Sequence, residues 1–203
     1  MHLKENIVGL KQELKHLALA MFRKDFVGIF HGSISAKIDT HSFLINKREA
    51  IFDDLCDDSL IELDFSMDYR WKSASVDARI HQSIYQNILD AKFVSYTMPP
   101  FTTSYAINNR TIKPVDYFGS INIGEIIIYD PKHFEDWYER AHTEIYKRFI
   151  EREDSLLVIR GYGVYVYGRN IDLMIKKIAI LENSCKILML SSKNAGLQTQ
   201  CLL

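Results

Sequence analysis

One stretch of the chain, Leu156 to Tyr167, reads LLVIRGYGVYVY, in which nearly every residue is apolar, aromatic or glycine. A strand of this composition is typical of a sheet that is covered on both faces. Helices predicted before and after it, at 134–151 and 171–190, each carry apolar residues along one face, as helices that pack on a sheet do. The stretch therefore predicts an α/β protein in which helices cover the faces of one sheet.

The rest of the chain alternates between helical and strand periods in the same way. Apolar residues at steps of three and four predict two more helices, from Ile7 to Met21 and from Ser75 to Leu89. Short apolar runs between turns rich in Gly, Ser and Asp predict further strands at 29–30, 34–38, 43–45, 91–98, 112–118 and 125–129. The segment 102–107 fits a short helix and an extended segment equally well. We expect one domain over residues 1–190 and a flexible tail over 191–203.

The charge and cysteine content exclude several classes of protein. The 203 residues include 25 basic and 26 acidic side chains mixed along the sequence, so no basic stripe predicts binding to nucleic acid or to a membrane surface. No uncharged apolar run is long enough to span a bilayer. Three cysteines, Cys56, Cys185 and Cys201, form no paired spacing, which favours reduced thiols. We therefore expect a cytoplasmic protein.

Three local patterns are candidates for chemistry. Tyr96 and Met98 lie two residues apart in a predicted strand and so share one face. Tyr162 stands between two glycines, which allows close approach of a backbone or a ligand, although on sequence alone a tyrosine packed over glycines in a sheet is the simpler interpretation. Asp77 and His81 lie four residues apart on one side of a predicted helix, where the aspartate could also serve only as a helix cap. The sequence has no nucleophilic triad and no phosphate-binding glycine loop.

Several short motifs follow one another in a fixed order between about Leu10 and Leu190. They are Gly32-Ser33-Ile34-Ser35, Leu44-Ile45-Asn46-Lys47, Ser75-Val76-Asp77 with His81 and Tyr85, Tyr96-Thr97-Met98, Ile107-Asn108-Asn109-Arg110-Thr111-Ile112, and Tyr162-Gly163-Val164-Tyr165-Val166-Tyr167-Gly168. This order resembles the class II aldolase/adducin family, which includes fuculose-phosphate aldolase and ribulose-phosphate epimerase. The resemblance implies a three-layer αβα fold whose central β-sheet is mixed and largely antiparallel, and it implies a homotetramer.

The resemblance also locates a metal site that this chain has lost. Family enzymes hold a divalent metal, usually zinc, with three histidines, and those positions fall here on Tyr96, Met98 and Tyr162. A phenol with a pKa near 10 stays protonated at neutral pH, and a thioether is a soft ligand that does not suit zinc alone. We therefore expect no metal and no zinc cofactor.

The other functional positions of the family are retained in part. The family's carboxylate falls on Asp77 and its catalytic tyrosine, which comes from a neighbouring subunit, falls on Tyr117, although a tyrosine in a strand is also common for packing alone. The phosphate-binding positions fall on four residues, which we take as candidates for substrate binding: Ser33, Lys47, Arg48 and Ser75. Lys47 and Arg48 could equally be a solvated pair of cations on a turn.

Two hypotheses follow. In the first, the side chains that replace the histidines fill the metal site, and the protein has a binding or assembly role, as the adducin head domain has within the family. Its ligand would be small and anionic or sugar-like. In the second, the protein is a divergent aldolase, epimerase or dehydratase that uses Asp77 and tyrosines as acid–base groups on a hydroxycarbonyl compound, with Arg160 or Lys113 stabilising negative charge.

Overall fold

The computed structural model describes residues 2–28 and 31–200. Its central sheet has six strands in the order β3-β2-β1-β4-β8-β7, and every neighbouring pair is antiparallel. The strands are β1 (Ser33–Lys37), β2 (Ser42–Asn46), β3 (Leu60–Asp64), β4 (Phe93–Thr97), β7 (Leu156–Ile159) and β8 (Gly163–Gly168). A separate ladder joins β5 (Thr111–Ile112) to β6 (Ile126–Ile127). One isolated bridge between Tyr129 and Ile159 is parallel.

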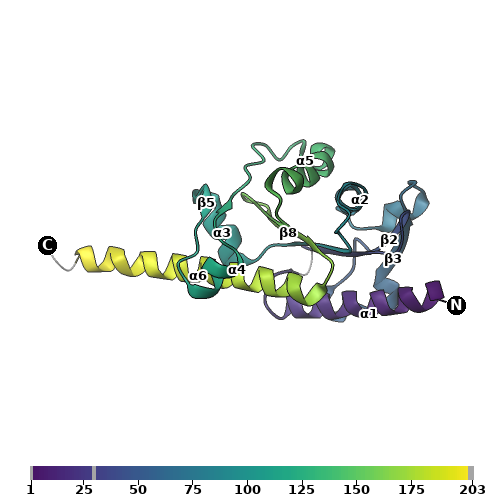
Figure 1. Ribbon diagram of the computed structural model, residues 1–203, viewed down its shortest axis with the longest axis horizontal. Coiled ribbons are helices and arrows are strands. Elements are labelled where there is room, and N and C mark those ends of the chain that lie inside the picture. Colours follow the sequence, from purple (N-terminus) through teal and green to yellow (C-terminus); the bar gives the residue numbers. More distant parts are fainter. Residues whose placement is uncertain (1, 29–30, 201–203) are drawn as a thin grey trace.

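Helices cover both faces of this sheet, as Figure 1 shows. The helices α2 (Ala78–Asn87) and α5 (Trp137–Arg152) lie on one face, and α1 (His2–Phe22) and α6 (Ile171–Gln200) run along the other. The short helices α3 (Pro100–Asn108) and α4 (Tyr117–Asn122) lie close to α6. Three 3₁₀ turns complete the elements: η1 (Phe52–Asp54), η2 (Asp57–Ser59) and η3 (Tyr69–Ser73). The three-layer arrangement expected from the resemblance is therefore confirmed.

Apolar residues at the predicted spacing explain why the helices pack as they do. In α1, Leu10, Leu14, Leu17 and Met21 are all buried under the sheet. Each apolar side chain of this kind contributes roughly 1.5–3 kcal/mol when it leaves water. In α5, four buried residues repeat at steps of four, and they are Trp137, Ala141, Ile145 and Phe149. The helical periods of the sequence therefore predicted correctly which faces of these helices are buried.

The strand β1 gives the two faces of the sheet different characters. Ile34 and Ala36 point into the core beneath α1, whereas Ser33 and Ser35 point toward α2 and are fully buried. Two serines inside a core need hydrogen-bond partners, because an unpaired buried hydroxyl costs about 1–3 kcal/mol. The face under α2 therefore needs polar partners at this point.

The apolar stretch that predicted a single strand folds as a hairpin. Residues 156–159 form β7, residues 163–168 form β8, and the chain reverses at Gly161, whose φ is +68°. All four residues of β7 and the first four of β8 are buried, so the prediction of a strand covered on both faces is confirmed for each arm. The turn was not predicted because Arg160-Gly161-Tyr162 contains one glycine and no proline, asparagine or aspartate.

Other boundaries differ from the predictions. The expected strand 112–118 is only two residues long, and helix α4 begins at Tyr117, where Asp116 accepts a hydrogen bond from the Gly119 N–H. The open segment 102–107 is helical. The strand β3 was missed. The last helix continues to Gln200 rather than ending at Leu190, so the expected tail from 191 begins within a helix. The predicted strand 29–30 lies outside the described residues.

The described cysteines are unpaired, with Cys56 exposed and Cys185 buried. Cys201 lies outside the described residues. Within 2–28 and 31–200, no helix is both long and apolar enough to cross a membrane.

The pairing of β4 with β8 supports a first prediction, at Gly163. The φ of Gly163 is +145°, and a Cβ there would lie 2.3 Å from the Thr97 carbonyl oxygen. We expect Gly163→Ala to lower the free energy of unfolding by about 3 kcal/mol or more, because backbone strain and a backbone clash add together. Urea unfolding measures this change.

Gly124 offers a matched control, since its φ is also positive (+69°) but nothing lies within 4 Å of its Cβ position. Gly124→Ala tests strain without a clash, and we expect a loss of about 1 kcal/mol. Equal losses in the two variants would show that the close contact at Gly163 does not matter.

Candidate functional site

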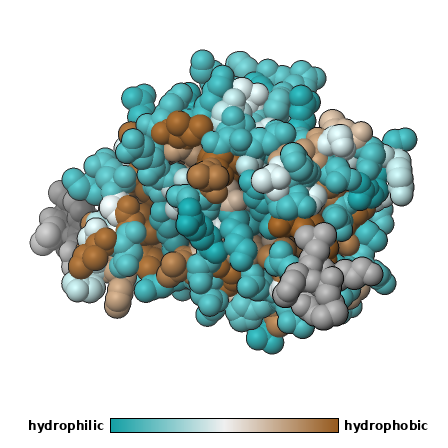
Figure 2. Space-filling model, turned by 45° about the vertical axis from the view of Figure 1, so that its right-hand side comes forward, coloured by the Kyte–Doolittle hydropathy of each residue, from teal (hydrophilic) through white to brown (hydrophobic). Residues whose placement is uncertain are grey.

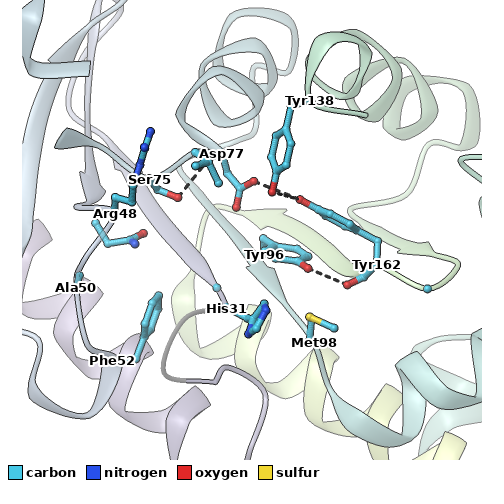
Figure 3. A pocket seen from close by; sticks show the side chains of 14 residues that line it. His31, Arg48, Ala50, Phe52, Ser75, Asp77, Tyr96, Met98, Tyr138 and Tyr162 are labelled. Atoms are coloured by element: carbon cyan, nitrogen blue, oxygen red, sulfur yellow. Dashed lines mark hydrogen bonds between the residues drawn. The ribbon is translucent and has the colours of Figure 1, made fainter. Parts of the chain in front are cut away.

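A cavity of about 280 Å³ opens at the end of the sheet where β1, β4 and the β7–β8 turn meet (Figure 3). Arg48, Ser75 and Asp77 line one side of it. The residues at the three metal-ligand positions of the family line the other side, and they are Tyr96, Met98 and Tyr162. Segments distant in the sequence therefore supply a single site, in which six of the residues singled out from the sequence come together.

The geometry of β4 and the β7–β8 turn explains how the three substituted residues converge. Tyr96 and Met98 alternate onto one face of the sheet, as predicted, while Tyr162 is held in the turn between two glycines of positive φ. The Tyr96 hydroxyl donates a hydrogen bond of 2.7 Å to the Tyr162 carbonyl oxygen, and the two rings lie 4.7 Å apart. The two tyrosine rings thus pack against each other at a tilt of 31°.

These side chains do not fit the family's zinc ion. The Tyr96 hydroxyl is committed to a backbone carbonyl, and the Tyr162 hydroxyl lies 3.4 Å from Asp77 Oδ1 and 3.2 Å from the Tyr138 hydroxyl. Burial raises the pKa of both phenols above their ordinary value, so they remain neutral, and Met98 offers only a thioether. Among the described residues, no group of three His, Cys, Asp or Glu side chains could hold a metal ion.

The expectation that these side chains fill the site is wrong in one respect. They take the places of the three ligands, but a cavity of about 280 Å³ remains in front of them. Tyr96 is 6% exposed, whereas Tyr162 and Met98 are partly exposed. The cavity therefore stays open in front of these side chains.

Asp77 is the buried carboxyl of this site. It precedes α2 with only 3% of its surface exposed, and its side chain makes no cap to the helix, which excludes the helix-cap reading. Its Oδ2 accepts a hydrogen bond of 2.8 Å from the Ser33 hydroxyl. Burial raises the pKa of this carboxyl above its usual range, although Ser33 and the nearby phenols of Tyr165 and Tyr162 oppose that effect. Ser75 Oγ accepts a bond of 3.3 Å from the Asp77 N–H and so orients this residue instead of capping the helix.

A chain of buried hydrogen bonds lies behind Asp77. Ser33 Oγ is 2.8 Å from His81 Nε2, and His81 Nδ1 is 2.6 Å from Ser35 Oγ. Ser35 Oγ is in turn 2.6 Å from the Tyr85 hydroxyl. All five residues are at most 3% exposed, and burial lowers the pKa of His81 to about 3. The imidazole is therefore neutral, and its two nitrogens provide hydrogen-bond partners for the two serines of β1.

The remaining candidates separate into those inside and those outside the cavity. Ser33 lies one layer behind the lining, bonded to Asp77 and His81. Arg48 lines the cavity but the adjacent Lys47 does not. Tyr117 is 73% exposed at the start of α4 and does not line the cavity. Its neighbour in space is Phe118, with ring centroids 5.4 Å apart.

The two residues nominated to stabilise negative charge do not reach the cavity. The Arg160 guanidinium lies 3.2 Å from Asp130 and donates to the Asn109 carbonyl. Lys113 is exposed and is not part of the lining. This part of the second hypothesis is therefore wrong, because the β7–β8 turn directs Arg160 away from Tyr162.

Sequence reasoning missed several residues of the site. His31 and Phe52 line the cavity, and Tyr138 reaches it from α5. Tyr165 lies behind it, where the charge of Asp77 helps to raise the pKa of this buried phenol, yet its hydroxyl falls short of hydrogen-bond geometry. Of these residues, only His31 could have been found from the sequence, because it directly precedes the Gly32-Ser33 motif.

The buried imidazole supports a prediction about pH. His81 has a pKa of about 3 in the fold and about 6.5 when the chain is unfolded, so its contribution to stability is complete above pH 6.5 and falls as the pH decreases toward 3. The raised pKa of Asp77 acts in the opposite direction. We expect the stability of the wild type, relative to that of His81→Gln, to fall by about 1.4 kcal/mol for each pH unit below 6.5.

Urea unfolding of both proteins between pH 8 and pH 5 checks this slope. The difference at pH 8, where the histidine is neutral in both states, gives the purely structural cost of the substitution. A difference that does not change with pH would mean that His81 does not resist protonation.

Comparison with known proteins places this geometry in a family. The model of the family described as "Class II Aldolase and Adducin N-terminal domain" matches residues 12–189. The L-fuculose phosphate aldolase of Methanocaldococcus jannaschii is 18% identical over 181 residues, which cover 89% of this chain and 96% of that protein.

Solved structures have the same fold. The L-fuculose-1-phosphate aldolase of Thermus thermophilus superposes with a TM-score of 0.78 at 18% identity, covering 92% of this chain and 96% of the other. A sugar-phosphate aldolase of Thermotoga maritima gives a TM-score of 0.72 at 12% identity, covering 93% and 95%. Because the family model spans most of the sequence, the chain belongs to the class II aldolase and adducin family.

Proposed function

We propose that this protein binds a small anionic or sugar-like ligand in the cavity at Asp77 and does not carry out the zinc-dependent aldol chemistry of its relatives. The observation that carries the proposal is the composition of the cavity wall. Arg48 and Ser75 provide a cation and a hydroxyl on one side, while neutral phenols and a thioether replace the metal ligands on the other. A polar ligand of this kind is held by a few directed groups in a largely apolar pocket.

The size of the cavity supports a small ligand. A volume of about 280 Å³ lies near the lower end of the range for small-molecule pockets, about 300–1,000 Å³. The relatives act, by their names, on fuculose phosphate and on sugar phosphates. An anion placed at Arg48 with its hydroxyls toward Asp77 and Tyr162 would match the charges of this cavity.

A second candidate function is acid–base catalysis without a metal. The observation that favours it is the Tyr162 hydroxyl, which faces the cavity and lies 3.4 Å from the buried carboxyl of Asp77. A tyrosine paired with a carboxyl can pass a proton to or from a hydroxycarbonyl substrate, a contribution of about 10²- to 10⁴-fold. The observed position of Arg160 weakens this candidate, because among the described lining residues Arg48 is then the one arginine or lysine that could stabilise an oxyanion.

Self-association and cytoplasmic location also belong to the proposal. On the face shown in Figure 2, hydrophobic residues form patches among hydrophilic ones. Around α4 the exposed apolar side chains include Val115, Tyr117, Phe118 and Ile121, each more than 60% exposed. These side chains would suit contact with a second copy of the chain, and the homotetramer implied by the resemblance stays a prediction. Reduced cysteines support the cytoplasm.

Arg48 and Lys47 provide a matched test of anion binding. They carry the same charge on neighbouring positions, but only Arg48 lines the cavity. We expect Arg48→Ala to weaken the binding of a ketose 1-phosphate, or of inorganic phosphate, by about tenfold, since a hydrogen bond to a charged group contributes about 1.5 kcal/mol at an exposed site. Lys47→Ala should leave the affinity within about twofold. Isothermal titration calorimetry measures both, and equal weakening in the two variants would contradict binding inside the cavity.

The absence of zinc-dependent chemistry is testable directly. We expect the purified protein, dialysed against zinc, to retain far less than one equivalent of metal and to show no chelator-sensitive cleavage of ketose 1-phosphates, because phenols and a thioether are poor zinc ligands. A triple variant, Tyr96→His, Met98→His and Tyr162→His, serves as the positive control for metal analysis. Stoichiometric zinc with turnover that a chelator abolishes would overturn the first proposal. Turnover that resists the chelator and is lost in Asp77→Asn would favour the second candidate.

A further inference from the structure

The hydrogen bonds behind Asp77 have a direction that the chemistry of each group fixes. A serine hydroxyl has one hydrogen, and Ser33 donates it to Asp77 Oδ2. Ser33 Oγ must therefore accept from His81 Nε2, so the proton of the neutral ring is on Nε2 and Nδ1 accepts from Ser35. Ser35 then accepts from the Tyr85 hydroxyl. With Asp77 ionised, every donor in the chain points toward the carboxylate.

A proton on Asp77 Oδ2 reverses that direction. The carboxyl would donate to Ser33, and Ser33 would donate to His81 Nε2, which must then be unprotonated. The single proton of the neutral ring would sit on Nδ1 and be donated to Ser35. The two protonation states of Asp77 therefore require opposite tautomers of His81.

Tyr162 and Ser33 contact different oxygens of the carboxyl. The Tyr162 hydroxyl lies 3.4 Å from Asp77 Oδ1, whereas Ser33 is bonded to Oδ2. The Tyr138 hydroxyl lies 3.2 Å from that of Tyr162, and the Tyr138 side chain, which is 52% exposed, lies at the mouth of the cavity. Oδ1 thus lies on the side of Tyr162 and the cavity, and Oδ2 lies on the side of Ser33 and His81.

The cation Arg48 lines the same cavity as Asp77, whereas the groups that hydrogen-bond to this pair or pack against it are neutral. They are Ser33 and Ser35 on β1, Tyr85 on α2, Tyr96 on β4, Tyr162 and Tyr165 on the β7–β8 hairpin, and Tyr138 on α5. Among the described residues, no Lys, Arg or second carboxylate hydrogen-bonds to Asp77 or His81. Among these partners, the imidazole is the group that can respond to the carboxyl by exchanging one tautomer for the other.

We propose that Ser33 and His81 are positioning residues that direct the proton of Asp77 to Oδ2, with the His81 tautomer switching from Nε2–H to Nδ1–H as the carboxyl is protonated. Protons balance in this scheme: the carboxyl gains one from solvent or from a ligand, and the imidazole keeps one throughout while the serine hydroxyls reverse. The inference rests on the proposed function in that Asp77 serves a ligand in the cavity. In this scheme Tyr162 contacts the ligand, and the Asp77 carboxyl lies behind Tyr162.

The tautomer can be read by ¹⁵N nuclear magnetic resonance of histidine-labelled protein, with the signals of His81 assigned from their loss in His81→Gln. The protonation of Asp77 is followed in parallel by the infrared carbonyl band of the protonated carboxyl, which must be missing in Asp77→Asn. We expect the wild type to change from Nε2–H to Nδ1–H over the same pH range in which that band appears.

Two variants separate this relay, the hydrogen bonds that link Asp77, Ser33, His81 and Ser35, from simple packing. Ser33→Ala removes the link between Asp77 and His81, so the carboxyl should still titrate while the tautomer no longer changes, and the titration midpoint should move upward because the ionised form loses a donor. Ser35→Ala keeps that link but removes the partner of Nδ1, so the ring should remain Nε2–H at all pH values. A wild-type tautomer that stays constant while Asp77 titrates would overturn the proposal, as would a tautomer that still switches in Ser33→Ala.

Phosphate titration on the same proteins distinguishes the two proposals. Arg48 is expected to hold the anion and takes no part in the relay, so Arg48→Ala should weaken the binding of inorganic phosphate by about tenfold while its His81 tautomer still switches. A tautomer switch without phosphate binding would support the relay and contradict the proposed function. Phosphate binding with a constant tautomer would contradict the relay alone.

Discussion

The close contact between β4 and β8 is the constraint on which the site depends. Gly163 approaches the Thr97 carbonyl so closely that no side chain fits at that position, and this contact pins the turn that carries Tyr162 against Tyr96 and Met98. The two tyrosine rings then pack against each other, with the Tyr96 hydroxyl bonded to the Tyr162 backbone. A wider spacing between these strands would separate the three positions and open the cavity to the core.

A second constraint is the polar layer between β1 and α2. Two serines on an otherwise apolar sheet face, one imidazole and one carboxyl are buried together, and each finds a partner in the others. Removing a single partner would leave a buried polar group unsatisfied, at a cost of about 1–3 kcal/mol. A network of this kind fixes the orientation of its members more strictly than apolar packing does, which is why Asp77 can be both buried and directed at a pocket.

The positions that the resemblance assigns to the family's three metal-binding histidines hold Tyr96, Met98 and Tyr162 here, which bears on what the pocket can do chemically. A bound zinc ion would supply a Lewis acid for the charge of an enediolate, whereas phenols and a thioether supply only neutral hydrogen-bond donors and apolar surface. The remaining acid–base groups, Asp77 and Tyr162, lie side by side, and burial raises the pKa of each above its ordinary value. Such a site is suited to donating hydrogen bonds to an oxygen-rich ligand, and the cation for a negative group is Arg48 at its edge.

The sequence by itself determined the layers of the fold, because the period of apolar residues reports which face of each helix and strand is buried. It also determined that Tyr96, Met98 and Asp77 belong to one site, since their motifs kept the family order. Only the tertiary structure decided the rest. The hairpin turn at Gly161, the withdrawal of Arg160 to Asp130, the open cavity and the contribution of Tyr138 each depend on contacts between segments far apart in the chain. The direction of the hydrogen bonds behind Asp77 also depends on the tertiary structure, because Ser33 meets Asp77 and His81 only when α2 packs across β1.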